Sequence, residues 1–399
     1  MSPIRVFIVD DSVVIRRLLT DAISADPMCE VAGTASNGAI ALEKLDRDLP
    51  DVVTLDIEMP VMDGLETLRE LRKRHPRLPV VMLSTLTERG ARATLDALAS
   101  GANDFVAKPA NVGSVTEGIA AIQNELLPRL KALTGTRSTA SGATARSQAS
   151  GGSTRPAGGP ASAVRGSSAV PSPAARSAVG QSTPAAIAPR TRFGVAPRPS
   201  VIVIGVSTGG PNALTEVWRS LPTELRVPIV IVQHMPPVFT ELLAKRLDDV
   251  GTIPVVQAID GAELQPGRAY LAPGDHHLVI EGHEPALRLR LNQDPPENSC
   301  RPSVDPLFRS AVNVYGANVL GLILTGMGSD GLSGARAIRS AGGVILAQDE
   351  ATSVVWGMPG AVVRAGLADV VVPLDAVASE LVARCSKSSP SDLRRLANR

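Results

Sequence analysis

The chain has 399 residues, of which 44% are hydrophobic and 20% are charged, and its formal net charge at pH 7 is +1. This length predicts two or three domains, and the near-neutral charge argues against nucleic acid as a partner. Aromatic residues make up 2% of the chain, which also disfavours a stacking surface for single-stranded nucleic acid. The three cysteines are far apart and form no CxxC pair, so neither a zinc site nor a redox pair is expected. With no signal peptide and no apolar run of membrane-spanning length, the sequence predicts a cytoplasmic protein without a membrane insertion.

The first part of the chain alternates short apolar runs with amphipathic stretches. Strand-like runs are predicted at residues 5–10, 30–35, 52–57, 80–84 and 104–107. Each run is followed by a helical pattern, and a fivefold repeat of this kind is typical of a doubly wound parallel sheet. We therefore predict a flavodoxin-like α/β domain over residues 3–133.

A compositional change marks the middle of the chain. From about residue 135 to residue 200 the sequence is mainly Ala, Ser, Gly, Thr and Pro with scattered Arg, and it contains no Asp or Glu. Such a segment buries too little apolar surface to offset its conformational entropy. We predict a flexible, disordered linker over residues 134–199.

Apolar runs followed by helical patterns return after the linker. They are predicted as strands at residues 201–206, 229–233, 319–325 and 344–347, with a hairpin-like insert at 269–291. This pattern predicts a second doubly wound parallel α/β domain over residues 200–388. The expected fold class is therefore α/β, with two parallel-sheet domains joined by the disordered linker.

Polar residues stand at the ends of the predicted strands of the first domain. Ligand sites of open parallel sheets lie at the carboxyl ends of the strands, so these residues should share one pocket. A single residue of this kind could be a solvated acid or a helix cap. Three carboxylates, a hydroxyl and an ammonium together predict a pocket for a divalent cation. The residues are Asp10, Asp11, Asp56, Ser84 and Lys108.

The segments VDDS, LDIEMPVMDG, MLST and FVAKP resemble the response-regulator receiver family. The resemblance implies that a histidine kinase phosphorylates Asp56. It also implies that Asp10, Asp11 and Asp56 bind Mg²⁺, and that Ser84 and Lys108 contact the phosphoryl group. Phe105 occupies the place where receivers often carry an aromatic that follows the switch, and an ordinary core position is the alternative.

In the second domain, VIVIGVSTGG is a buried strand that runs into a Gly-rich turn and a helix, with Ser207 at the corner. The glycine spacing does not fit a dinucleotide-binding GxGxxG, and the Gly-Lys-Ser/Thr element of a P-loop is absent. The turn does match GxSxG, which places a serine hydroxyl near free amides at the start of a helix. Ser207 is therefore a candidate nucleophile.

A nucleophilic serine needs a base and an orienting acid at other strand ends. His234 directly ends the apolar run PIVIVQHMP, and Asp330 lies in the Gly-rich turn of LILTGMGSDG. His276 and His277, after APGD, are the rival bases. The order Ser, His, Asp differs from that of α/β-hydrolases, so GxSxG does not imply that fold, although any order can form a triad.

The segments GVSTGG, QHMPP, APGDHHL, RPSVDPLF and TGMGSDG resemble the catalytic domain of the CheB family of chemotaxis protein-glutamate methylesterases. The resemblance implies a nucleophilic Ser207, a general base His234, an orienting Asp330 and oxyanion donors near Thr208 and Met327. It implies that methylated chemoreceptors are the substrates, that receptor glutamines are also deamidated, and that the catalytic domain uses no cofactor. Val206 stands where a small residue is expected, and the linker is longer than expected for the family.

The segment RPSVD adds a candidate substrate-positioning residue, Arg301. In the alternative interpretation, Asp305 caps the following helix and Arg301 pairs with Asp305. A receiver is often joined to a DNA-binding domain, but no helix-turn-helix or basic face is evident, and an adaptor module is the remaining alternative. We further expect that the unphosphorylated receiver packs over Ser207 and that phosphorylation of Asp56 loosens this contact.

Overall fold

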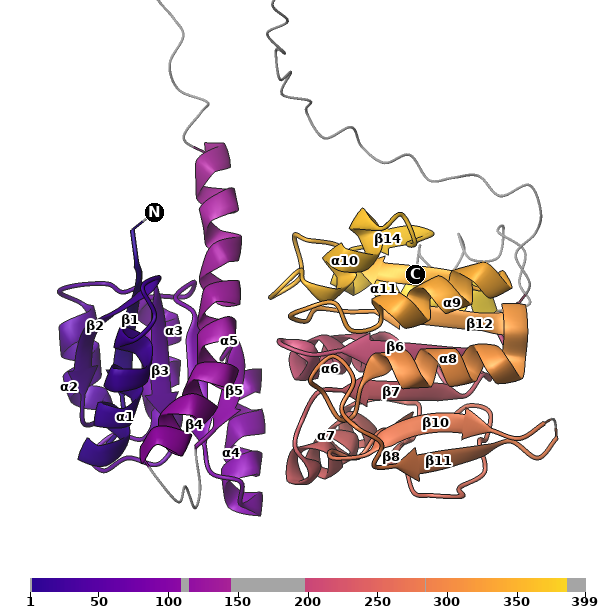
Figure 1. Cartoon of the computed structure of the whole chain (residues 1–399), viewed down its shortest axis with the longest axis horizontal. Helices are drawn as coiled ribbons and strands as arrows, with labels where there is room; N and C mark the ends of the chain where they lie inside the picture. The colour runs from indigo at the N-terminus through magenta and orange to yellow at the C-terminus, as the bar shows by residue number, and fades with distance from the viewer. Residues whose placement is uncertain (1, 109–114, 145–197, 284, 386–399) are drawn as a thin grey trace, which may run out of the picture.

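The fold is described from a computed structural model, which describes residues 2–108, 115–144, 198–283 and 285–385. Two parallel sheets, each covered by helices on both faces, lie side by side (Figure 1). The prediction of two doubly wound α/β domains is thereby confirmed.

The N-terminal sheet has the strand order β2-β1-β3-β4-β5, and every neighbouring pair is parallel. This order is that of the flavodoxin-like fold. The strands are β1 (Ile4–Val9), β2 (Cys29–Ala35), β3 (Val52–Asp56), β4 (Val80–Ser84) and β5 (Asp104–Ala107). The helices are α1 (Val13–Ser24), α2 (Gly38–Leu45), α3 (Gly64–Arg74), α4 (Glu88–Ala99) and α5 (Val115–Thr144).

Local sequence explains where these helices begin. The Ser12 hydroxyl accepts a hydrogen bond from Ile15 N and caps α1, so the capping role belongs to Ser12. A capping box between Asp63 and Glu66 starts α3. Helix α5 continues to Thr144, past the predicted domain end at residue 133. Residues 145–197 of the predicted linker lie outside the described residues, so the linker and its boundaries stay predictions.

The C-terminal sheet has seven strands in the order β14-β13-β12-β6-β7-β9-β8, again all parallel. They are β6 (Val201–Val206), β7 (Ile229–Gln233), β8 (Val255–Gln257), β9 (Ala269–Leu271), β12 (Val319–Ile323), β13 (Val344–Gln348) and β14 (Val370–Val372). The helices are α6 (Gly210–Ser220), α7 (Pro237–Val250), α8 (Val304–Tyr315), α9 (Leu332–Ala341), α10 (Met358–Arg364) and α11 (Val377–Cys385), with short 3-10 turns at Gly316–Asn318 and Leu374–Ala376.

The predicted hairpin-like insert is narrower than expected. Strands β10 (His277–Glu281) and β11 (Arg288–Asn292) do form an antiparallel pair outside the main sheet. The start of the predicted insert, however, is β9, which is fully buried and pairs in parallel with β7 and β8. Burial on both faces of the sheet explains why β9 belongs to the main sheet.

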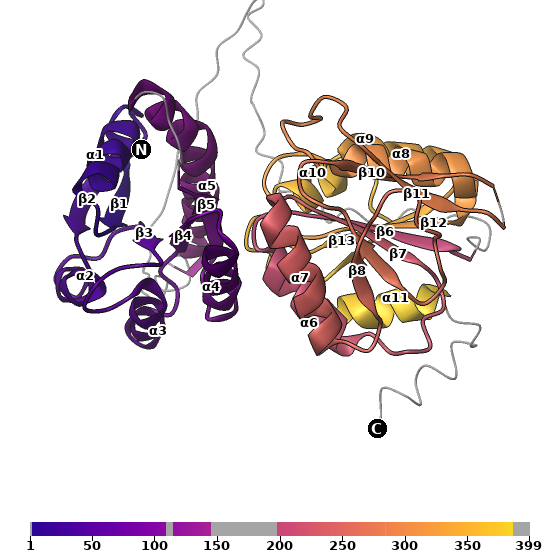
Figure 2. The same cartoon turned by 90° about the horizontal axis from the view of Figure 1, so that it is seen from below.

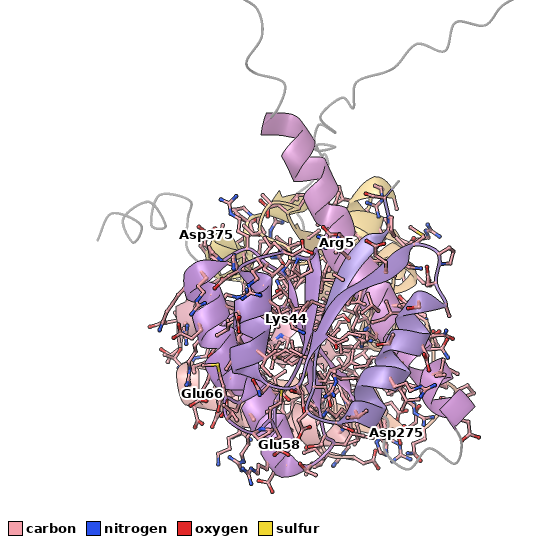
Figure 3. All side chains as sticks on the ribbon, turned by 90° about the vertical axis from the view of Figure 1, so that its left-hand side faces the viewer. Arg5, Lys44, Glu58, Glu66, Asp275 and Asp375 are labelled. Carbon is pink, nitrogen blue, oxygen red and sulfur yellow. The ribbon has the colours of Figure 1, made fainter. Side chains whose placement is uncertain are left out.

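The two domains contact each other mainly through α4 of the first, which lies against α6 and α7 of the second (Figure 1, Figure 2). The rings of Phe105 and Phe239 stack with their centroids 4.4 Å apart. Asn212 Nδ2 donates a 2.7 Å hydrogen bond to Leu98 O, and Arg246 pairs with Asp96 at 3.2 Å. Viewed from the receiver side, the N-terminal domain overlies most of the second domain (Figure 3).

No helix among the described residues combines the length and the apolar character needed to cross a membrane.

Candidate active site and receiver pocket

The turn after β6 holds Ser207 rigidly. Ser207 N donates to Thr325 O at 3.0 Å, and Ser207 O accepts hydrogen bonds from Gly210 N and from the side-chain amide of Gln233. Gly209 has a φ of 78°, in the left-handed region that glycine adopts without strain. The tight turn therefore places Ser207 at the carboxyl edge of the sheet, between β6 and α6.

His234 and Asp330 meet at the same edge of the sheet. His234 follows β7, and its Nε2 lies 2.8 Å from Asp330 Oδ2. The side chains are 12% and 3% exposed, so solvent screens this pair poorly. The structure thus brings together the predicted base and the predicted acid.

The Asp330 carboxylate is held by an unusually complete set of donors. Three backbone amides at or beside the start of α8 and α9, from Val304, Asp305 and Gly331, donate to it at 2.7–3.2 Å. The Ser303 hydroxyl and the Asn298 amide add side-chain hydrogen bonds of 2.8 Å each. Helix N-termini favour negative charge, so this arrangement keeps Asp330 ionised and fixed in direction.

Burial and partner charge act in opposite directions on the pair. Burial alone lowers the pKa of His234, but hydrogen bonds and charge from Asp330 and Cys300 outweigh it and raise the pKa to about 9. Burial alone raises the pKa of Asp330, and His234 with the surrounding donors reverses that shift and lowers it. In this conformation the imidazole is mostly protonated at neutral pH and is a poor base.

Ser207 and His234 line the same cavity, which has a volume of about 160 Å³. Across the described residues, however, no hydrogen bond joins the Ser207 hydroxyl to the imidazole. The second ring nitrogen, His234 Nδ1, instead lies 3.5 Å from Cys300 Sγ. The structure therefore shows the His–Asp pair assembled and the serine close by, without the final hydrogen bond of a triad.

The predicted oxyanion donors, Thr208 and Met327, lie in the two Gly-rich turns that follow β6 and β12. Within the described parts of the chain, neither backbone amide donates a hydrogen bond, so both are available to an incoming oxygen. An ideal Cβ placed on Gly326, next to Met327, would lie 2.8 Å from Ser207 Cβ, so these two turns are in close contact.

Arg301 and Asp305 have other partners than the ones considered from the sequence. Arg301 forms an ion pair with Asp275 at 2.6 Å, so the alternative interpretation in which Arg301 pairs with Asp305 is wrong. Asp305 accepts from Gly334 N at 2.7 Å and so caps α9 rather than its own helix. A substrate-positioning role for Arg301 stays a prediction.

The rival bases are engaged elsewhere. His277 is 1% exposed, its Nε2 lies 3.2 Å from Pro295 O, and its Nδ1 accepts from Ser303 N. His276 Nδ1 lies 3.3 Å from Gly274 O. His277 thus supports the loop that holds Asp330, and His234 remains the base candidate of the cavity.

The receiver pocket gathers the predicted carboxylates. Asp10, Asp11 and Asp56 each offer an oxygen, and these oxygens lie within 4.8 Å of one another. Lys108 Nζ lies 2.9 Å from Asp10 Oδ2 and 2.7 Å from Asp56 Oδ2. Burial raises the pKa of Asp56 to about 6, although Lys108 partly counteracts this shift. Three carboxylates, two of them buried and Asp11 exposed, together with one ammonium fit a hard divalent cation such as Mg²⁺.

Among the described residues, the Ser84 hydroxyl forms its hydrogen bonds with groups other than Asp56. Its hydroxyl donates to Thr85 O and Gly90 O and accepts from Thr94 at 2.7 Å. Its expected contact with a phosphoryl group stays a prediction. The observed hydrogen bonds join Ser84 to the start of α4, the helix that contacts the second domain.

Residues of the receiver also line the cavity around Ser207 and His234. Asp104, at the start of β5, is 7% exposed, and its Oδ2 accepts a 2.7 Å hydrogen bond from the Thr208 hydroxyl. Arg129 Nε of α5 lies 3.2 Å from the same oxygen. Asp104, Phe105 and Arg129 all line the cavity. The candidate active site is therefore covered by the receiver.

Sequence reasoning did not single out Asp104, Asn298 or Cys300, and it included Ser303 only as part of the RPSVD stretch. From the sequence, Asp104 is only the first residue of a predicted strand. Its partner Thr208 is more than a hundred residues away in the chain, so no local pattern connects the two. Ser303 was within reach, since it belongs to the RPSVD segment that follows the predicted insert.

Comparisons with known proteins agree with this architecture. Residues 202–381 match the family model described as CheB methylesterase, and residues 6–120 match that of the response regulator receiver domain. A Nocardioides protein named protein-glutamate methylesterase/protein-glutamine glutaminase is 49% identical over 98% of both chains. A Trichodesmium erythraeum protein of the same name is 42% identical, over 96% of this chain and 99% of its own. The crystal structure of the Thermotoga maritima CheB methylesterase catalytic domain is 41% identical, with a TM-score of 0.46, over 46% of this chain and 98% of that one. The chain belongs to the CheB methylesterase family and carries a response regulator receiver domain ahead of its catalytic domain.

Proposed function

We propose that the chain is a protein-glutamate methylesterase and protein-glutamine glutaminase that uses Ser207, His234 and Asp330. The observation that carries this proposal is the buried His234–Asp330 pair, which lies beside Ser207 in one cavity at the carboxyl edge of a parallel sheet. The relatives' names supply the substrate chemistry, a methyl ester or a primary amide at a glutamyl side chain.

In the reaction, the Ser207 oxygen attacks the carbonyl carbon of the γ-methyl ester while the imidazole takes the hydroxyl proton. The nitrogen that accepts it is Nδ1, because Nε2 is engaged with Asp330. Asp330 stabilises the imidazolium, and the amides of Thr208 and Met327 stabilise the oxyanion. Collapse returns the proton to the leaving methanol. Water then hydrolyses the acyl-enzyme by the same steps, and ammonia replaces methanol when the substrate is a glutamine.

The receiver controls this reaction by covering the cavity. Thr208, next to the nucleophile, is hydrogen-bonded to Asp104 of the receiver, and Phe239 is stacked on Phe105. A methylated protein side chain needs access to Ser207, so hydrolysis requires the receiver to move. Phosphorylation of Asp56 adds nearly two negative charges beside Lys108 and shifts the domain away from its docked arrangement.

Mg²⁺ fits the receiver pocket, where Asp10, Asp11 and Asp56 would hold it. When bound, it neutralises charge on the phosphoryl group during transfer to a carboxylate. Asp56 offers the attacking carboxylate oxygen, and Lys108, with its pKa raised by the two neighbouring carboxylates despite burial, stays protonated and adds a second positive charge.

The proposed partners are methyl-accepting chemoreceptors, as substrates, and a histidine kinase, as phosphodonor. Both rest on the family and its receiver domain. Placement in the cytoplasm belongs to the same proposal.

The test measures methanol released from methylated chemoreceptor membranes, with and without acetyl phosphate and Mg²⁺. Wild type, Ser207→Ala and Asp56→Asn are compared. We expect Ser207→Ala to abolish release and Asp56→Asn to keep basal release without the phosphodonor response. Release that persists in Ser207→Ala would refute the assignment of the nucleophile.

A further inference from the structure

A short turn beside the catalytic pair is firmly anchored. Residues 297–300 close on themselves through a 2.9 Å hydrogen bond from Cys300 N to Glu297 O. Glu297 also forms a 2.6 Å ion pair with Arg309, which ties the turn to α8. Asn298 and Ser299 both adopt positive φ values, 53° and 62°, that non-glycine residues adopt at a cost.

The first contact of this turn is made by Asn298. Its Nδ2 donates to Asp330 Oδ1 at 2.8 Å and to Asp305 Oδ2 at 3.0 Å. Both carboxylates are buried, at 2% and 4% exposure, and two buried like charges repel. One amide group donates both of its N–H groups to the two carboxylates, which offsets their repulsion and fixes the direction of Asp330.

The second contact is made by Cys300, whose Sγ lies 3.5 Å from His234 Nδ1. Nδ1 can form a single in-plane hydrogen bond, as a donor when the imidazole is protonated and as an acceptor when it is neutral. Its neighbour in this structure is the Cys300 sulfur, which favours the protonated ring. Ser207 can lose its proton only to an Nδ1 that is unprotonated and free of this contact.

We propose that Asn298 and Cys300 act together as a clamp on the His234–Asp330 pair, in which Asn298 positions the carboxylate and Cys300 competes with Ser207 for the imidazole. The proposal rests on the proposed function, since it takes Ser207 as the nucleophile. Both are positioning residues. The clamp holds the pair assembled but idle, and catalysis begins when the Ser207 hydroxyl displaces the thiol from Nδ1.

The competition predicts opposite effects for the two clamp residues. Cys300→Ala removes the competitor and also removes the influence of Cys300 that raises the pKa of His234. Reaction at Ser207 should then be about two- to tenfold faster at neutral pH, the range for the loss of one ordinary hydrogen bond. The acid limb of the pH profile, where the rate falls because the imidazole becomes protonated, should move to lower pH. Cys300→Ser keeps a polar partner for Nδ1 and should stay near wild type.

Asn298→Gly keeps the positive φ accessible and removes the amide. Reaction at Ser207 should slow by about 10- to 150-fold, the range for the loss of a hydrogen bond to a charged group. Ser299→Gly is the matched control, because Ser299 shares the turn geometry and its side chain makes no hydrogen bond within the described residues. Cys385→Ala is the matched control for the thiol.

The experiment measures the rate constant of Ser207 labelling by a fluorophosphonate, from pH 5 to pH 10, on the full chain with acetyl phosphate and Mg²⁺. Unfolded molecules lower the amplitude of labelling but leave the rate constant of the folded molecules unchanged.

Faster labelling with a shifted acid limb in Cys300→Ala, and slower labelling in Asn298→Gly, support the clamp. A Cys300→Ala profile identical to that of Cys385→Ala overturns the competition, and an Asn298→Gly rate equal to that of Ser299→Gly overturns the positioning role. Ser207→Ala tests the proposed function separately: labelling that survives in it refutes the nucleophile, whatever the clamp variants do.

Discussion

Replacing Asp104 by alanine should release the catalytic domain from the receiver without any phosphorylation. The substitution removes a 2.7 Å hydrogen bond from the Thr208 hydroxyl and leaves Arg129 without its 3.2 Å ion pair. Asp104 is 7% exposed, so solvent replaces these contacts only after the domains separate.

The size of the effect follows from the chemistry of this contact. A hydrogen bond to a charged group contributes about 1.5–3 kcal/mol. The ratio of undocked to docked protein should therefore rise by about 10- to 150-fold, at about 1.4 kcal/mol for each factor of ten. Basal esterase activity should rise by the same factor until nearly all molecules are undocked. Asp96→Ala is the control, because its pair with Arg246 is more exposed and contributes about 0.2–1 kcal/mol, equivalent to an increase of up to about fivefold.

The assay compares initial rates of methanol release from methylated receptors without a phosphodonor. Fluorophosphonate labelling of Ser207 gives a second readout that needs no receptor. Thermal unfolding of Asp104→Ala checks that both domains remain folded. If its basal rate matched that of the Asp96→Ala variant while acetyl phosphate still activated the wild type, the Asp104 contact would not be the one that holds the site shut.

Other expectations concern the two titrating sites. At pH 7 and without divalent cations, Asp56→Asn should stabilise the receiver by up to about 3 kcal/mol, because a carboxyl whose pKa rises from 3.8 to about 6 on folding costs stability when ionised. The ionised Asp56 carboxylate lowers the stability of the receiver only while it is charged, so the stability gained in Asp56→Asn should be complete above about pH 6 and vanish below about pH 4. Equal thermal unfolding of wild type and Asp56→Asn at pH 7 would contradict this expectation. Asp330→Asn should lower esterase turnover by about four orders of magnitude with little change in unphosphorylated docking, since it removes the charge that orients and stabilises the His234 imidazolium. Turnover within tenfold of wild type would show that another group orients the imidazole.

The sequence predicted most of the sheet framework, because buried parallel strands appear as uninterrupted apolar runs. The runs at 201–206, 229–233, 80–84 and 104–107 agree with the observed strands residue for residue. The edge strands β8 and β14 were missed, since each has three residues and exposes part of its surface, which leaves no clear pattern.

The candidate site was predictable where a residue directly ends a strand. His234 and Asp56 were found in this way, because topology alone places strand ends at one edge of the sheet. Asn298 and Cys300 follow no strand of either sheet, and their importance depends on a turn whose path is set by Arg309 and by positive φ values. Periodicity carries no information about such a path. The pairing of Arg301 failed for a related reason, since two residues close in sequence need not face each other across a turn.

The sequence predicted that the receiver packs over Ser207, but it did not predict which residues make the contact. Strand β5 connects the receiver pocket with this contact. Lys108, immediately after this four-residue strand, pairs with Asp56, while Asp104, at its start, binds Thr208 beside the nucleophile. Phe105, between them, stacks on Phe239. β5 is the edge strand of the receiver sheet, and it is short enough that Asp104 begins it and Lys108 directly follows it. In the proposed regulation, a change in the charge that Lys108 faces shifts this strand and so reaches Asp104. The strand beside the receiver pocket thus also supplies the contacts that cover the candidate active site, and in the proposed regulation it links Asp56 to Ser207 in the other domain.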